Sequence, residues 1–480
     1  MNIVLIVTDT QNKRMVGAYG QTQMDTPNLD RLAAQGMRFE RAYPVCPLCV
    51  PARGTIFSGL YPQLNGVWCN NVAPARNVPL MGEIFRNLGY RAGHTGKWHL
   101  DGTGYFGDGR PDGGFEPDWW YDGKNYADDL GPEMFKAYKS AKTADDLRRA
   151  GFTETNCWGH RVADRAVDFL ERAGEDPFVL SVCFDEPHSP YVAPPEYWEK
   201  FETIGLPATA NYCRPPQDKP KLAEVHHEAL RQQGRVPDES GAMVYNPRFF
   251  GCNSYIDREI GRVVDAVDRL HADDTVIIYT SDHGDQMLSH GLIGKGPMMY
   301  EESCNVPLIV RGPGVPEGAV SHALFSQLDL MPTMLDLAGL ERPDTLNGVS
   351  QAPTLRDPSH ASREHAMLVF HRFAINHDSR GEFYPIRCVT DGRYKLIVNL
   401  FESDELYDLE TDPDELHNRI EDSACESVRD ALHDRMLEEM DATRDPFRSF
   451  RWGDRPWRKA RSAFWIGKNR PRPSGFSFRE

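Results

Sequence analysis

Short apolar runs alternate with longer amphipathic stretches along the first 280 residues of this chain. Three of the runs have the length of buried strands: IVLIV at 3–7, FVLSVCF at 178–184 and TVIIYT at 275–280. The amphipathic stretches have the length and period of helices, and they cover residues 26–36, 81–89, 158–174 and 246–271. Strands that alternate with helices usually pair in parallel. The sequence therefore predicts an α/β fold with a mostly parallel central sheet and helices on both faces.

The pattern changes after about residue 366. Short β-like runs follow one another there, AMLVF, YPIRCV and YKLIVNLF, and a helical stretch, SVRDALHDRMLEEM, comes after them. We expect a large domain over residues 1–365 and a smaller α+β domain over 366–450. Residues 451–480 carry nine Lys or Arg against Asp454 and Glu480. They are predicted to form a basic, irregular tail that wraps the body or contacts a partner subunit in a homo-oligomer.

The net charge of the chain limits the kinds of molecule that it is expected to bind. The net charge is -17, and because the tail contributes +7, the other 450 residues carry a net charge near -24. Such an acidic body argues against a nucleic-acid groove, although a few local cations can still hold an anionic substrate. No apolar run approaches the ~20 residues of a membrane span, and the N-terminal run lacks the features of a signal peptide. We therefore expect a cytoplasmic protein with no membrane partner and with ten reduced cysteines.

Polar clusters follow the three buried strands directly. TDTQ comes after the first, DEPH after the second and SDHG after the third. In open parallel sheets, sites form at the carboxyl ends of the strands. Taken singly, Asp9 could cap a helix and His188 could lie in a turn. The convergence of three clusters at one edge predicts a functional site there.

The stretch CPLCVPARGTIF at residues 46–57 offers several interpretations. Cys46 and Cys49 could form a redox pair, but no thioredoxin-like unit surrounds them. They could bind zinc, but the chain has no second CxxC pair. They could also be two buried thiols at a strand-to-helix turn, which the CxxC pattern alone leaves open.

The residues downstream point to a known family. Cys49, Pro51 and Arg53 form C-x-P-x-R, GTIFSGLYP continues from it, and GYRAGHTGKWH lies at 89–99. Together with the polar clusters, in this order, these motifs resemble the type I sulfatases of the alkaline phosphatase superfamily. The similarity is closer to bacterial sulfatases that include uronic-acid 2-O-sulfatases of glycosaminoglycan degradation. The resemblance implies an alkaline-phosphatase-like fold and a sulfuric ester hydrolase acting on a sulfated saccharide.

The resemblance also implies a modified nucleophile. In this family the cysteine that corresponds to Cys49 is oxidised to formylglycine, by a formylglycine-generating enzyme or an anaerobic sulfatase-maturating enzyme. One hydroxyl of the hydrated aldehyde attacks sulfur, and the other expels sulfate as the aldehyde reforms. A divalent metal, Ca²⁺ by resemblance with Mg²⁺ or Mn²⁺ open, would be held by Asp9, Cys49, Asp282 and His283. The other catalytic candidates are Arg53, Lys97, His99, His188 and Lys295.

Two positions depart from the family pattern. Thr10 stands where many members have a second aspartate, and His283 stands where many have asparagine. Thr10 or Gln11 could supply a ligand oxygen in place of the missing carboxylate. Gln11 after the first strand and the Asp282-His283 pair are also similar to the phosphonate monoester hydrolases of the same superfamily. A formylglycine-dependent phosphonate monoester or phosphodiester hydrolase is therefore the first alternative. A non-catalytic binding member of the fold is an alternative of another class.

Substrate-binding candidates come from two segments. WCNNVAP supplies Trp68, Asn70 and Asn71, and FHRFAINHDSRGEFYPIR supplies His371, His377 and Arg387. An aromatic ring with amides suits a sugar, and an arginine suits a uronate carboxylate. The competing interpretation is a satisfied polar core at a domain interface.

Overall fold

The computed structural model describes residues 1–237, 241–375 and 383–459. Its largest element is an eight-stranded sheet in the order β10-β2-β9-β8-β1-β5-β3-β4. Strand β9 runs antiparallel to β8 and β2, and the other neighbours run parallel. The strands are β1 (Asn2–Thr8), β2 (Met37–Tyr43), β3 (Arg91–Gly96), β4 (Trp120–Tyr121), β5 (Phe178–Cys183), β8 (Thr275–Ser281), β9 (Leu308–Arg311) and β10 (Ala319–Ser326). The predicted mostly parallel sheet is confirmed.

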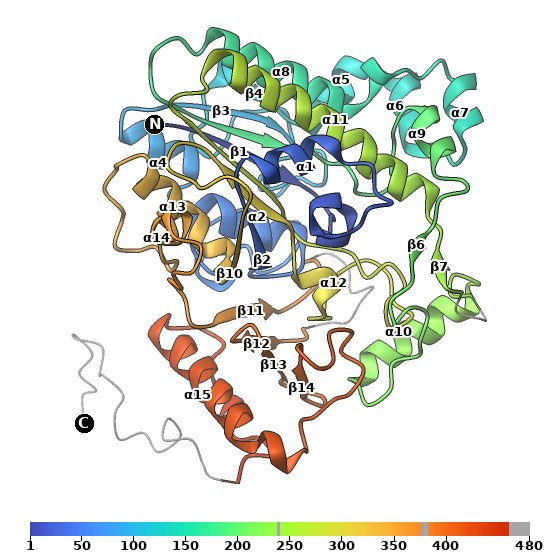
Figure 1. Cartoon of the computed structure of the whole chain (residues 1–480), viewed down its shortest axis with the longest axis vertical. Helices are drawn as coiled ribbons and strands as arrows, with labels where there is room; N and C mark the ends of the chain where they lie inside the picture. The colour runs from blue at the N-terminus through green and yellow to red at the C-terminus, as the bar shows by residue number, and fades with distance from the viewer. Residues whose placement is uncertain (238–240, 376–382, 460–480) are drawn as a thin grey trace.

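Helices cover both faces of this sheet (Figure 1). Val4 and Ile6 of β1 pack among side chains of α1 (Pro27–Ala34), α8 (Trp158–Arg172) and α11 (Pro247–Leu270). Leu5 and Val7 of the same strand pack on the opposite face, with α2 (Cys49–Ser58), α4 (Met81–Asn87) and α13 (Leu330–Leu337). Because β1 is buried on both faces, its sequence is a continuous apolar run rather than an alternating one.

A smaller antiparallel sheet follows, in the order β11-β12-β13-β14. Leu368 and Phe370 on one of its faces pack against the large domain. Val369 and Val389 on the other face lie under the long helix α15, which Figure 1 shows on the outer side of the molecule. The elements are β11 (Ala366–Phe370), β12 (Ile386–Thr390), β13 (Tyr394–Asn399), β14 (Glu405–Asp408) and α15 (Glu426–Ala442).

The first part of the predicted tail belongs to this smaller unit. Trp452 and Trp457 are buried in the same apolar cluster as α15. The Arg455 guanidinium donates to Asp404 at 2.7 Å, and Arg458 pairs with Asp434 at 2.9 Å. Residues 452–458 of the predicted tail therefore pack against the C-terminal unit. Residues 460–480, with the rest of the predicted tail, lie outside the described part.

Insertions between the core elements form a lobe at the carboxyl ends of the strands (Figure 1). One contains α5 (Gly123–Leu130), α6 (Pro132–Ser140) and α7 (Ala144–Arg149), and the other α9 (Pro195–Lys200), β6 (Leu206–Pro207), α10 (Lys221–Gln232) and β7 (Met243–Val244). Short helices complete the fold: α3 (Pro62–Asn65), α12 (Glu301–Cys304) and α14 (Ala352–Arg356). Within the described ranges, no helix has the length and apolar character that crossing a membrane requires.

Candidate active site

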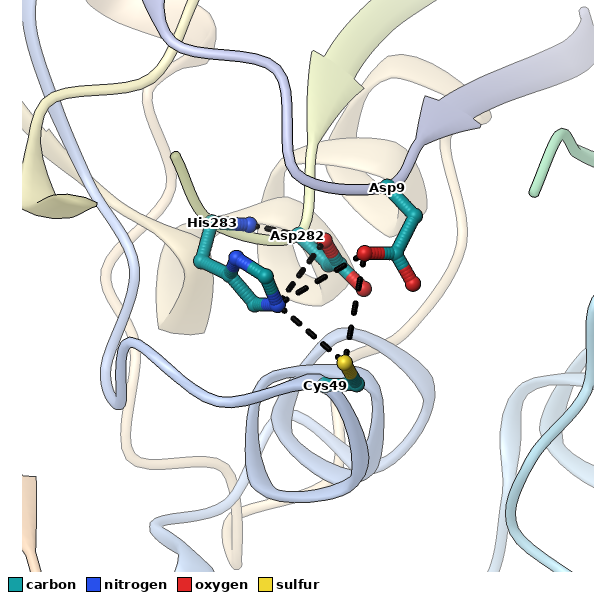
Figure 2. A group of neighbouring side chains, drawn as sticks. All are labelled: Asp9, Cys49, Asp282 and His283. Carbon is teal, nitrogen blue, oxygen red and sulfur yellow. Dashed lines mark hydrogen bonds and ion pairs between the residues drawn. The ribbon is translucent and has the colours of Figure 1, made fainter. Parts of the chain in front are cut away.

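The polar clusters after β1 and β8 meet at the start of helix α2. Figure 2 shows the Cys49 thiol facing Asp9, Asp282 and His283. The Cys49 Sγ lies 3.2 Å from His283 Nε2 and 3.9 Å from the nearer Asp9 oxygen. All four side chains are buried. Residues far apart in the chain therefore form one polar centre around residue 49.

Helix α2 places Cys49 at this centre. Cys49 is its first residue, so the thiol lies at the positive end of the helix. The Asn70 side-chain oxygen accepts the Val50 N–H at 3.1 Å, which satisfies one of the free donors of the first turn. The C-x-P-x-R motif is thus a helix start whose first side chain points at the strand ends.

The four side chains suit a divalent cation. The ligand atoms of Asp9, Cys49, Asp282 and His283 all lie within 4.8 Å of one another. His283 Nδ1 lies 2.9 Å from the Gly284 carbonyl oxygen, an acceptor, so Nδ1 carries the proton and Nε2 has a free lone pair. Burial and the neighbouring Asp9 carboxylate raise the pKa of Asp282 to about 6. A bound cation would relieve this crowding of carboxylates.

Arg53 and Lys97 surround the carboxylates with fixed positive charge. Arg53 donates from Nε to Asp282 at 3.0 Å and from a terminal nitrogen to the Lys97 carbonyl at 2.8 Å. The Lys97 ammonium lies 2.6 Å from Asp9 and 3.0 Å from Asp185. Burial opposes the charged form of Lys97, but Asp185 and Asp9 outweigh it and raise its pKa. Both cations are therefore charged at neutral pH.

Lys295 approaches from the loop after β8. Its ammonium donates to the Thr10 hydroxyl at 3.3 Å and lies 3.8 Å from Asp9. Burial lowers its pKa, but Cys49, Asp9 and Asp282 more than compensate, so the net shift is upward. Thr10 itself donates to Asp9 at 2.5 Å. Lys295 is thus a third cation at the centre, and it lies on the side that faces the cavity.

His188 is held by a tyrosine that the sequence did not single out. The Tyr105 hydroxyl lies 2.7 Å from His188 Nδ1 and also donates to Asp185. Burial, Lys295 and Lys97 lower the pKa of His188 well below its usual value. With Nδ1 engaged, Nε2 is the ring nitrogen left for proton transfer. A bound anion would raise the pKa again.

His99 lies deeper, beside the same tyrosine. Its ring meets the Tyr105 ring edge-on at 5.1 Å, and its Nδ1 has no hydrogen-bond partner among the described residues. Burial, followed by Lys97, lowers its pKa well below the usual value. His99 is therefore neutral, with one ring nitrogen free to bind a substrate atom.

A cavity of about 490 Å³ opens from this centre. Thr10, His188 and Lys295 form part of its wall. Side chains from the insertion lobe and nearby loops, most of them aromatic or polar, form most of the remainder: Tyr191, Tyr212, Arg235, Tyr245, Asn246, Phe249, Asp285, Met287 and Phe373. The volume is within the range of small-molecule sites, which is roughly 300–1,000 Å³.

Two predicted substrate-binding residues lie elsewhere. Arg387 is fully buried, and its guanidinium donates to Asp445 at 2.6 and 2.8 Å. A third contact joins Arg387 to His371 Nε2 at 3.0 Å, and His371 is buried too. Because the Asp445 carboxylate already occupies the guanidinium, Arg387 has no free face for a uronate. The assignment of both residues to substrate binding is corrected: they form a buried polar core, in which Arg387 is paired and His371 Nδ1 has no hydrogen-bond partner among the described residues.

The WCNNVAP residues border this polar core. The Trp68 ring contacts the rings of His371 and Phe447 at 6.4 and 6.3 Å. Asn70 is committed to the start of α2, as described above, and Asn71 has a positive φ of 66° in the following turn. None of Trp68, Asn70 and Asn71 is among the described residues that line the 490 Å³ cavity. His377 lies outside the described residues.

Two residues of the site, Tyr105 and Asp185, were not predicted individually from the sequence. Asp185 had a usable signal, because it stands in the DEPH cluster directly after a buried strand. Tyr105 had none, since it lies in the glycine-rich stretch GTGYFGDG. The Gln11 side chain is engaged away from the centre, because its nitrogen donates to Asn253 at 2.9 Å and its oxygen accepts from the Thr8 hydroxyl at 3.0 Å.

The sequence matches two family models. The model described as Sulfatase matches residues 1–340, and the model described as N-sulphoglucosamine sulphohydrolase, C-terminal, matches residues 289–442. The two models together span the large domain and most of the smaller one.

Relatives and a solved structure resemble nearly the whole chain. The chain is 40% identical over 484 residues to the uncharacterized sulfatase YidJ of Escherichia coli (strain K12), covering 99% of this chain and 94% of that protein. It is 29% identical over 487 residues to the delta 4,5-hexuronate-2-O-sulfatase of Bacteroides thetaiotaomicron, covering 94% and 91%. The phosphonate monoester hydrolase of Agrobacterium radiobacter shares the fold, with a TM-score of 0.71, 23% identity and coverage of 92% and 96%.

Proposed function

Since the chain belongs to the sulfatase family, we propose that it hydrolyses sulfate monoesters of carbohydrates, with uronic-acid 2-O-sulfates as the substrate class. It is a sulfuric ester hydrolase with an alkaline-phosphatase-like fold. The observation that carries the proposal is the Cys49 thiol at the start of α2, facing Asp9, Asp282 and His283. The saccharide class is supported by the relative that is a hexuronate 2-O-sulfatase.

The residues present fit the groups that sulfatases generally use. We propose that a maturating enzyme converts Cys49 to formylglycine, which supplies the nucleophilic hydroxyl. The metal would lower the pKa of that hydroxyl. Two carboxylates and one imidazole are compatible with Ca²⁺, which we favour, and with Mg²⁺ or Mn²⁺.

The other charged and titratable side chains of the centre have separate roles, which follow from their charge and position. Lys97 and Lys295 lie on either side of Asp9 and would neutralise the sulfate oxygens as negative charge develops on them. Arg53 donates to the Asp282 carboxylate and to the Lys97 carbonyl, so it fixes the positions of these two residues relative to each other. His188 would protonate the leaving oxygen, because its Nδ1 is held by Tyr105 and it lines the cavity that receives the alcohol.

A phosphonate monoester or phosphodiester hydrolase is the second candidate. Thr10 offers a hydroxyl where a further carboxylate would add negative charge, so the centre is more positive than in members with two aspartates. Phosphonate monoesters and phosphate diesters carry one negative charge, as sulfate monoesters do. We therefore expect measurable side activity on them, with sulfated sugars preferred.

The test compares substrate classes on one preparation. The protein is produced with a formylglycine-generating enzyme, and residue 49 is examined by mass spectrometry. Turnover is measured on sulfated disaccharides, an activated aryl sulfate and a phosphonate monoester, with Cys49→Ala as the inactive variant and Cys46→Ala as the matched control. Phosphonate turnover above that of every sulfated sugar would favour the second candidate. An unmodified Cys49 and no turnover would favour a non-catalytic binding protein.

A further inference from the structure

An arginine from the insertion lobe lines the cavity that leads to the reaction centre. Arg235 follows the end of helix α10, and it shares the wall of the 490 Å³ cavity with His188 and Lys295. No carboxylate forms an ion pair with Arg235 within the described ranges. Arg235 is also exposed, so its guanidinium can meet a ligand from solvent.

Nearby arginines are committed to other contacts. Arg53 is bound to Asp282, and Arg387 is bound to Asp445. Arg248, next to the same cavity wall, donates to the backbone carbonyls of Ala141 and Pro190. Arg235 is the one arginine among the described residues of the cavity lining. A free guanidinium presents a planar fork that matches the oxygens of a carboxylate or sulfate.

The rest of the wall suits a sugar between the two cations. Tyr191, Tyr245 and Phe373 line the cavity, so their rings supply apolar surface on which a sugar ring can pack. Asp285 binds the Met287 and Gly294 N–H groups through Oδ1, at 2.9 and 3.1 Å. These bonds fix its carboxylate in the cavity wall, where Oδ2 can accept sugar hydroxyls.

We propose that Arg235 forms an anionic subsite, which binds a second negative group on the saccharide whose sulfate ester is cleaved. That group is a carboxylate or a second sulfate. The subsite rests on the proposed function, because it assumes that Lys295 and His188 mark where the scissile sulfate is bound. It moves recognition of the second anion from Arg387, which is buried and paired, to the wall of the open cavity.

The experiment separates the subsite from the reaction centre. Arg235→Gln removes the charge and keeps a polar side chain, and Arg235→Lys keeps the charge without the fork. Arg231→Gln is the matched control, since Arg231 lies one turn earlier on α10 and pairs with Glu228 at 2.9 Å. Each variant is assayed on an activated aryl sulfate without a second anion, and on a 2-O-sulfated unsaturated uronate disaccharide with its carboxyl-reduced form. A 6-O-sulfated glucosamine with and without an N-sulfate completes the set.

We expect Arg235→Gln to lower kcat/KM on the doubly anionic substrates by roughly 10- to 100-fold, because this is the usual loss when a hydrogen bond between charged groups is removed. Arg235→Lys should recover part of this loss. Activity on the aryl sulfate should stay within about twofold of the parent, and Arg231→Gln should match the parent throughout. A loss that disappears for the carboxyl-reduced sugar identifies the carboxylate, and a loss confined to the disulfated glucosamine identifies the second sulfate.

Two results would overturn the subsite. One is an unchanged kcat/KM of Arg235→Gln on every doubly anionic substrate that the parent cleaves. The other is an equal loss on the aryl sulfate, which would mean a general effect on the fold or centre. A parent enzyme that cleaves the aryl sulfate but shows no Arg235 effect leaves the proposed function standing. A parent enzyme that cleaves no sulfate ester overturns both.

Discussion

Replacing Arg387 with methionine should destabilise the protein and leave substrate binding intact. The Arg387 guanidinium makes two hydrogen bonds to Asp445 Oδ2, one to the Ile386 carbonyl at 2.9 Å and one to His371. It also lies over the Trp452 ring, 5.1 Å from its centroid. Both charged side chains of the pair are fully buried. The substitution keeps the volume but leaves the Asp445 carboxylate without its partner.

The size of the loss follows from this burial. Removing one partner of a buried ion pair costs about 3–5 kcal/mol, because the other charge stays in a medium that solvates it poorly. Unfolding entropy is about 2.1 cal/mol/K per residue, so for 480 residues each kcal/mol lowers the melting temperature by roughly 1 °C. We therefore expect Arg387→Met to melt about 3–5 °C lower if the chain unfolds as one unit, and further if the smaller domain unfolds first.

Calorimetry and kinetics on the same samples provide the assay. The double variant Arg387→Met with Asp445→Leu removes both charges and should recover most of the lost stability, which a double-mutant cycle quantifies. KM for the sulfated saccharide, measured well below the melting transition, should stay within about twofold of the parent. An unchanged melting temperature together with a KM raised tenfold or more would refute this reasoning and return Arg387 to the substrate site.

Three further predictions concern the proposed general acid His188, the buried carboxyl group of Glu186 and the divalent metal. His188→Ala should lower kcat on an alkyl sugar sulfate by about 10²–10⁴ but far less on an activated aryl sulfate, and equal losses in the kinetic comparison would remove His188 from the acid role. Burial raises the pKa of Glu186 to about 8, above its unfolded value, so its protonated form stabilises the fold at low pH and that contribution is lost as pH rises toward 8. In denaturant titrations, the free energy of unfolding of Glu186→Gln relative to that of the parent should therefore rise by on the order of 3 kcal/mol between pH 5 and pH 8. A difference between variant and parent that stays constant over this pH range would contradict the prediction. A chelator should abolish sulfatase activity and lower the melting temperature; recovery with Mn²⁺ but not Ca²⁺ would exclude calcium as the native ion.

Local pattern was enough for the fold class and the family. The apolar runs at 3–7, 178–184 and 275–280 became β1, β5 and β8, because a strand buried on both faces needs only a continuous apolar run. The antiparallel strand β9 was not predicted, since LIVR is four residues long and has no period to read. Its direction depends on pairing with β8 and β2, which are distant in the chain.

The sequence by itself determined the centre around Cys49, because a motif and three strand ends specify those residues through the topology of a parallel sheet. The catalytic and metal roles assigned there stay predictions until the variants are measured. Only the tertiary structure decided the surroundings. It placed Arg387 against Asp445, joined Tyr105 to His188 and put Arg235 on the cavity wall. The physical reason is that burial and ion pairing depend on contacts between segments that are tens of residues apart or more. The sequence does not show whether an arginine is paired with a carboxylate in the folded protein.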